Sequence, residues 1–236
     1  RTAGARRGGA PAWSRIATVS LTLTVVRDVA DIVVPVAIVL RGVTVHAHDA
    51  RLDGPLAAAA DALREATGLE EAIAATRAMY KRCGIDPTRT RPSSEALLRR
   101  VRRGDPLPRV NGLVDIINWC SAETQISFGL YDVAKVQPPV TLRLGTTGEG
   151  YDGIRKDRVN VEGRLTLADA IGPLGNPTSD SARTMTTPET TDALVVLFVP
   201  GVAPAAARER AFTITRERFA TYAGGQAEPV TIVVAQ

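Results

Sequence analysis

The chain has 236 residues, of which 44% are hydrophobic, 23% charged and only 4% aromatic, and its formal net charge is +4. This composition is that of a globular protein long enough to bury its own core, and it excludes a disordered chain. The few aromatic residues exclude a nucleic-acid platform of many stacked rings. Two cysteines, Cys83 and Cys120, are too few for a disulfide scaffold and lack metal-ligand spacing, so we expect no metal and no cofactor.

The N-terminal residues 1–12 are rich in Arg, Gly and Ala, which predicts a flexible basic tail before a single domain over residues 13–236. This tail lacks the apolar stretch and the cleavage site of a secretory signal peptide. The longest apolar stretch, residues 29–45, is interrupted by Asp31 and Arg41 and is too short to cross a membrane. We therefore expect a cytoplasmic protein with no membrane partner.

The first half of the chain predicts strands followed by helices. Apolar and β-branched runs favour three strands, over residues 20–26, 31–40 and 43–46. Helical periodicity favours four helices, over residues 53–67, 69–83, 95–103 and 113–120. Asp53 is the expected N-cap of the first helix, and Ser93 or Ser94 that of the third.

The second half returns to strands, because the apolar period changes from Phe128 onwards. Strands separated by Gly, Pro and Asp turns are expected over residues 140–144, 159–161, 165–168 and 194–199. A last helix over residues 204–222 precedes a closing strand over residues 230–235. This order predicts an α+β fold, either a mainly antiparallel sheet or a closed barrel, with inserted helices.

Basic residues gather in the middle of the chain. Residues 77–109 contain ten Lys or Arg and three acids, a difference of +7, so the remainder carries −3. A local basic patch is what binding to a phosphate backbone requires, although a solvated helix face has the same composition. The candidate RNA-binding residues are Arg89, Arg91, Arg99, Arg100, Arg102 and Arg103.

Two polar groups of residues are candidates for chemistry. Asp115 and Asn118 are three residues apart and share one face of the predicted helix 113–120. Asn118, in an apolar helix, either orients a carbonyl group or a water molecule or ties the helix to neighbouring loops. The second group either lines a pocket or forms a network of Asx and Ser/Thr turns. It comprises Asp180, Ser181, Arg183, Thr184 and Thr187.

Three further sets of residues have both a chemical and a structural interpretation. Glu149 and Asp152 form either a carboxylate pair on a mobile loop or an ordinary surface turn. Cys120 is either a nucleophile or a small buried hydrophobic residue. His46 and His48 share one face of a predicted strand, as acid–base groups or as edge residues. We favour the structural interpretation for all three.

Three motifs carry a resemblance to a known family. The first motif consists of GIDP at residues 84–87 and RPSSEALLRRV at residues 91–101. The second consists of LPRVNGLVDIIN at residues 107–118 and GLYD at residues 129–132. The third is LTLADAIGPLGNPTSDSARTMTTPETT at residues 165–191. Together they resemble the B3/B4 domain of the phenylalanyl-tRNA synthetase β subunit, and most closely its free-standing relatives. The resemblance covers residues 19–200, and it implies a barrel-like fold with a tRNA-binding and editing pocket.

The resemblance also implies roles for individual residues. Asp115 and Asn118 hold the Asp and Asn of the family's motif, and the closing aromatic–Asp pair falls on residues 131–132. Gly129 stands where the family has a His, and Val196 where it has an acidic residue. The substrate-binding candidates are accordingly Asp115, Gly129, Tyr131, Asp132, Ser181, Arg183 and Thr184.

The expected function is that of an RNA-associated domain that binds the acceptor end of an aminoacyl-tRNA. If it also hydrolyses a mischarged aminoacyl ester, the resemblance and the polar residues point to Asn118, Asp180 and Thr187 as catalytic residues. The replaced positions Gly129 and Val196 favour an alternative, in which the pocket serves an amino-acid-like small molecule without tRNA. A binding module beside another protein is the third interpretation.

Overall fold

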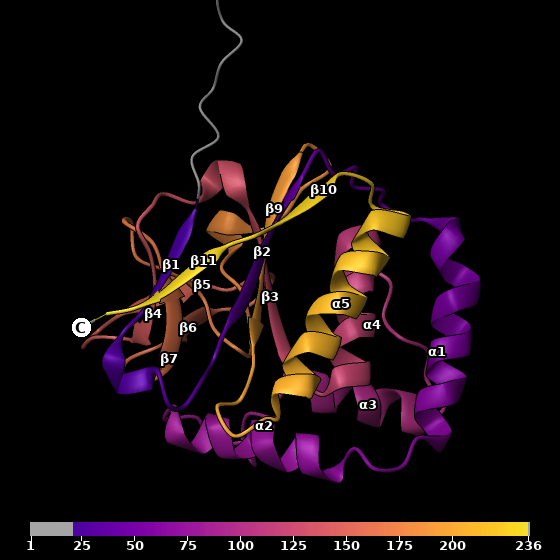
Figure 1. The fold of residues 1–236 in the computed structure, drawn as a ribbon, viewed down its shortest axis with the longest axis horizontal. Coiled ribbons are helices and arrows are strands. Elements are labelled where there is room, and N and C mark those ends of the chain that lie inside the picture. Colours follow the sequence, from indigo (N-terminus) through magenta and orange to yellow (C-terminus); the bar gives the residue numbers. More distant parts are fainter. Residues whose placement is uncertain (1–20, 236) are drawn as a thin grey trace, which may run out of the picture.

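A four-stranded antiparallel sheet lies in the middle of the molecule (Figure 1). Its order is β10–β2–β9–β3, over Gln226–Pro229, Val36–Arg41, Asp192–Phe198 and Ser127–Asp132. The structure is a computed structural model that describes residues 21–235. The predicted basic tail of residues 1–12 therefore lies outside the described residues.

Strand β9 lies between β2 and β3, and both of its faces are buried, which explains its continuous apolar sequence. Side chains of successive residues in a strand point to opposite faces of the sheet. Val195 and Leu197 accordingly pack in the core beneath the helices. Leu194 and Val196 pack in a second core, between the two sheets. The molecule thus has a layer of helices, a middle sheet and an outer sheet.

The outer sheet has five strands in the order β11–β1–β4–β7–β8. They span Thr231–Val234, Thr22–Val25, Val140–Leu144, Leu165–Ala168 and Pro173–Gly175. β1 pairs in parallel with β11 and β4, and the remaining pairs are antiparallel. β5 (Gly150–Asp152) and β6 (Arg158–Asn160) form a separate hairpin. The α+β fold with mainly antiparallel pairing is confirmed, whereas both main sheets are open, so the closed barrel is not formed.

Four helices cover the middle sheet, and the fifth runs along one end of the layers (Figure 1). The covering helices are α1 (Asp53–Glu65), α3 (Ser93–Arg102), α4 (Gly112–Thr124) and α5 (Ala205–Tyr222). The fifth, α2, spans Glu70–Arg82. Four short 3₁₀ helices, η1 to η4, span Arg27–Val29, Ala50–Leu52, Val133–Lys135 and Ala182–Thr184. All five helices predicted from periodicity are confirmed, and α4 continues beyond its predicted end to Thr124.

Two predicted strands near the N-terminus differ from the structure. The run at residues 31–40 begins as a strand only at Val36, because the amides of residues 32 and 33 bond back to Val29 in a turn. The predicted strand at residues 43–46 is wrong. Its backbone groups bond instead to scattered partners, among them the amide of Gly112, which donates to His46 O at 2.8 Å.

The expected helix caps also differ. Asp49, rather than Asp53, accepts the backbone N–H at the start of the helical turn that leads into α1. Neither Ser93 nor Ser94 caps α3. The buried Ser94 hydroxyl donates instead to the carbonyl oxygen of Gln125 at 3.2 Å, which joins α3 to the end of α4.

Candidate functional site

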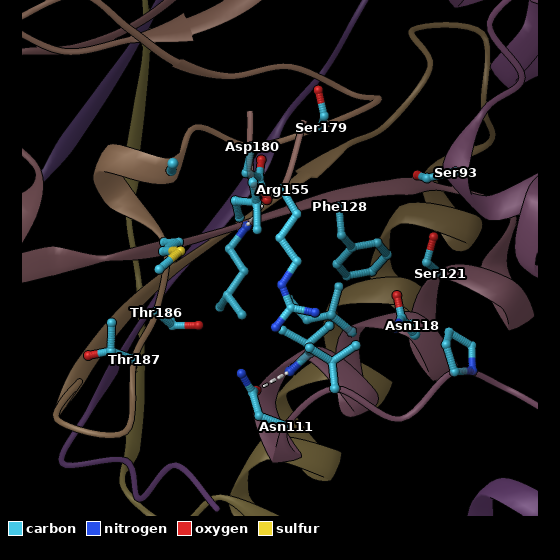
Figure 2. A pocket seen from close by; sticks show the side chains of 18 of the residues that line it. Ser93, Asn111, Asn118, Ser121, Phe128, Arg155, Ser179, Asp180, Thr186 and Thr187 are labelled. Carbon is cyan, nitrogen blue, oxygen red and sulfur yellow. Dashed lines mark hydrogen bonds between the residues drawn. The ribbon is translucent and has the colours of Figure 1, made fainter. Parts of the chain in front are cut away.

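A cavity of about 1000 Å³ opens between the helices and the loop that leads from β8 to β9. Helix α4 contributes Asn118 to its wall, and the loop contributes Asp180 and Thr187 (Figure 2). The three residues selected from the sequence as catalytic candidates therefore line one cavity, although they come from segments some 60 residues apart.

The cavity is lined mostly by apolar residues, with polar groups among them. The apolar lining residues include Val45, Leu97, Val114, Ile117, Phe128 and Leu130. The uncharged polar lining residues are Ser93, Asn111, Asn118, Ser121, Thr178, Ser179, Thr186 and Thr187. The charged lining residues are Asp180, Arg155 and Lys156. An apolar cavity with a few convergent polar groups is the common form of a small-molecule site.

The start of α4 explains how Asn118 reaches the cavity. Asn111 has extended backbone angles, and its side-chain oxygen accepts the amide of Val114 at 3.0 Å. This N-cap fixes where the helix begins, and so which face it turns to the cavity. The half-buried Asn118 amide makes no hydrogen bond with another side chain or backbone group in residues 21–235, so it is available to a ligand.

Asp180 lies in an unusual environment. Its Oδ2 accepts the Leu130 amide at 3.2 Å, while its Oδ1 is buried and has no hydrogen-bond partner among the described residues. The buried Tyr131 hydroxyl, also without a partner there, lies close by, and both oxygens border Gly175. Burial raises the pKa of Asp180 to about 7, although the Tyr131 hydroxyl and the Leu130 amide oppose this rise. The carboxyl is therefore able to exchange a proton near neutral pH.

None of the seven substrate-binding candidates lines the cavity, and two of them are buried carboxylates. Asp115 is 1% exposed, and its carboxylate accepts hydrogen bonds from Arg109 Nε and from the Val110 amide, each at 2.7 Å. It therefore anchors the segment that precedes α4. Asp132, also buried, accepts the hydroxyl of Thr190 at 2.8 Å and caps η3. Both carboxylates shape the loops around the cavity without facing it.

Gly129 and Tyr131 point to the opposite face of β3 from Leu130, which lines the cavity. The Tyr131 side chain is buried between the sheets and lies against Gly129. Val196, in the position of the family's acidic residue, is buried in the same core. The structure therefore places neither of the two replaced positions on the cavity wall.

The remaining three substrate-binding candidates follow Asp180 directly. Ser181 caps η4, and Thr184 is buried. Arg183 pairs with the buried Asp169 at 2.9 Å. Ser181 and Arg183 line a smaller hollow, of about 550 Å³, beside the β5–β6 hairpin. These residues hold the loop that carries Asp180.

Four of the six candidate RNA-binding arginines bind groups of the protein itself. Arg91 pairs with Glu95, and Arg103 pairs with Asp105. Arg100 donates to the carbonyl oxygen of Pro106, and Arg102 donates to that of Ala66. Arg89 and Arg99 are exposed, and neither side chain has a hydrogen bond or ion pair within residues 21–235. These two arginines are the ones free to meet a phosphate backbone.

For Glu149 and Cys120, the structure favours the structural interpretation over the chemical one. Glu149 accepts both terminal nitrogens of Arg143 at 2.7 Å, and these bonds lower the pKa of its carboxyl to about 2. Cys120 is fully buried, and burial raises the pKa of its thiol. Among residues 21–235, no group of three or more His, Cys, Asp or Glu is arranged to hold a metal ion. No helix of that part of the chain is long and apolar enough to cross a membrane.

Comparison with known proteins places the chain in a family. Residues 75–222, more than half of the chain, match the model of the B3/4 domain. The chain belongs to the B3/4 domain family. This confirms the resemblance carried by the three motifs, and the matched region contains every lining residue of the cavity except Val45 and Ala47.

One solved structure similar to this B3/4 domain protein is the crystal structure of an N-terminal fragment of the phenylalanyl-tRNA synthetase β subunit from Pyrococcus horikoshii. The two chains are 15% identical, with a TM-score of 0.49, and the match covers 91% of this chain and 52% of that one. This chain thus spans about half the length of that fragment. A search of the curated proteins finds no match.

Proposed function

We propose that this B3/4 domain protein binds the acceptor end of an aminoacyl-tRNA in its cavity and hydrolyses the ester of a wrongly attached amino acid. The observation that carries the proposal is the convergence of Asn118 and Asp180 on a cavity of about 1000 Å³ that is lined mostly by apolar residues. This volume is at the upper end for ligand sites, so it has room for an amino acid together with the terminal nucleoside.

Water is the proposed nucleophile, because none of the three cavity serines is set up to attack. The hydroxyl of Ser179 lies 3.5 Å from the hydroxyl oxygen of Tyr151, and the other two donate to backbone carbonyl oxygens. Ser121 donates to the carbonyl oxygen of Ile126 at 2.7 Å, and Ser93 to that of Pro177 at 3.3 Å. Within the part of the chain that the structure describes, none of the three serine hydroxyls is hydrogen-bonded to a base of the kind that activates a serine nucleophile.

Asp180 and Asn118 would divide the chemistry between them. The oxygen of water bonds to the ester carbonyl carbon while its proton passes to the Asp180 carboxylate, and the Asn118 amide donates to the oxyanion that forms. The bond from this carbon to the ribose oxygen then breaks, and Asp180 returns the proton to that oxygen. A pKa of about 7 suits both steps, since it favours neither form of the carboxyl near neutral pH.

Replacing Asn118 by Ala should lower the rate of deacylation about 100-fold, because the oxyanion loses a hydrogen-bond donor. The measurement is release of amino acid from a panel of mischarged tRNAs under single-turnover conditions. Asn160→Ala, at an exposed asparagine outside the cavity, is the matched control and should keep the wild-type rate. Deacylation no faster than in buffer with every tRNA would disprove the proposed activity, and an equal rate for Asn118→Ala would remove Asn118 from it.

Replacing both Arg89 and Arg99 by Gln should weaken tRNA binding and lower the slope of log affinity against log salt by one to two, at about one per phosphate contact. The matched control is Arg27→Gln, at an exposed arginine outside the basic segment. Equal affinity for wild type and the double variant, measured by filter binding over a range of salt, would identify the basic segment as solvated surface.

A free amino-acid-like molecule is the alternative ligand. It is favoured by the basic segment, in which four of the six candidate RNA-binding arginines bind groups of the protein itself. A rise in melting temperature with such a molecule, together with no tRNA binding, would support this alternative.

A further inference from the structure

Arg155 is a charged residue of the cavity wall that no sequence motif singles out. It lies in the turn between β5 and β6, and its side chain extends between Asp180 and the start of α4 (Figure 2). Its backbone is left-handed, with φ of +53°, which is uncommon for a residue other than glycine. Within residues 21–235 its guanidinium makes no hydrogen bond and no ion pair, so its charge is available to a ligand.

The β5–β6 turn is attached to the loop that carries Asp180. Gly153 and Ser181 form an isolated antiparallel bridge, and the amide of Ile154 donates to the carbonyl oxygen of Asp180 at 3.3 Å. The amide of Lys156 bonds back to the carbonyl oxygen of Gly153 at 3.3 Å and tightens the turn. These contacts hold the turn that carries Arg155 and Lys156 against the cavity.

The charges of the cavity do not balance. Among the described lining residues, Arg155 and Lys156 are two cations beside a single acid, Asp180, so one positive charge remains uncompensated even when Asp180 is ionised. A ligand that fills the cavity removes water from the guanidinium, which is costly unless the ligand itself brings an anion. A planar guanidinium with a neighbouring ammonium group suits phosphate oxygens well.

We propose that Arg155 and Lys156 form a phosphate-binding site at this cavity, so that its ligand carries a phosphate group next to an apolar body. The inference rests on the proposed function only for the source of that phosphate, which would be the terminal phosphodiester of the tRNA acceptor end. It also predicts that a neutral ligand with the same apolar body binds more weakly.

The test is a titration of the ¹⁵N-labelled protein with inorganic phosphate at constant ionic strength, followed through the arginine Nε–H signals. The signal of Arg155 is identified by its absence in Arg155→Gln. It should shift with saturation, and the affinity should fall about tenfold in Lys156→Gln, because a charge-assisted bond is lost. Arg27, which is exposed, lies outside the basic segment and has no side-chain partner among the described residues, is the internal control and should shift little.

Two outcomes would overturn the inference. One is a shift of Arg155 that does not saturate or that matches the shift of Arg27. The other is a parallel titration with acetate that saturates at an equal or lower concentration, since the site would then bind carboxylates. The readout uses neither tRNA nor turnover, so failure of the deacylation assay beside a saturating phosphate shift would reject the proposed function alone.

Discussion

Replacing Gly175 by Ala should lower the free energy of unfolding by about 2–3 kcal/mol. A Cβ atom at this position would lie 2.7 Å from Asp180 Oδ1, 2.8 Å from Tyr131 Cε1 and closer still to the Tyr131 hydroxyl oxygen. Tyr131 is fully buried between the sheets, so its ring has no free space into which to move. Equilibrium unfolding in urea measures the loss.

Two further variants separate this overlap from a general effect of adding a methyl group. Gly54→Ala, in the first turn of α1, is the matched control, because no atom lies within 4 Å of the added Cβ. It should be neutral or slightly stabilising. Tyr131→Phe removes the atom closest to the new methyl group, so it should reduce the cost of Gly175→Ala when the two are combined. A loss for Gly175→Ala no larger than for Gly54→Ala would contradict the close packing of glycine, tyrosine and carboxyl.

Asp180 should make the folded state less stable as the pH rises from about 4 to 7. Its pKa is about 7 in the folded protein, against an ordinary value of 3.8 for an aspartate side chain. Between these values the folded state holds a proton that the unfolded state has lost, so the free energy of unfolding falls with rising pH. One pKa unit corresponds to 1.36 kcal/mol, and we expect a change of about 2–4 kcal/mol across this range.

The comparison with Asp180→Asn isolates this carboxyl, because the other titrating groups are common to both proteins. The difference in free energy of unfolding, wild type minus variant, should decrease steadily from pH 4 to pH 7 and then become constant. Tyr131 and Lys156 are the titratable neighbours that act on Asp180, and both are retained in the variant. A difference that stays constant from pH 4 to pH 8 would show that Asp180 ionises normally in the folded protein.

Asn118, Asp180 and Thr187 could be selected from the sequence because local patterns determine α4 and the loop after β8, whereas none of the seven substrate-binding candidates lines the cavity. The apolar periodicity of residues 113–120 predicts a helix, and the polar run at residues 180–187 predicts a loop with exposed donors and acceptors. Asn111 could have been found as well, since an Asn before a Gly and an apolar run is a common helix start. Asn118 could be selected because it is a polar residue in an otherwise apolar helix.

The missed features depend on contacts that no local pattern encodes. Arg155 and Lys156 reach the cavity because one bridge joins Gly153 to Ser181, and nothing in the hairpin sequence specifies that pairing. β3 is buried along its whole length, so it lacks the alternation that identifies a strand with one exposed face. β8 and β10 are short and contain Gly or Pro, which favour turns when read locally. The choice between open sheets and a barrel likewise depends on whether distant edges meet.

Tyr131 connects two regions that would otherwise be independent. Its ring belongs to the hydrophobic interior shared by both sheets, yet its hydroxyl reaches the carboxyl that we assign to proton transfer. Substitutions in that interior, at residues that contact no ligand, would therefore change the pKa of the Asp180 carboxyl. Relatives with identical cavity walls would then work best at different pH values.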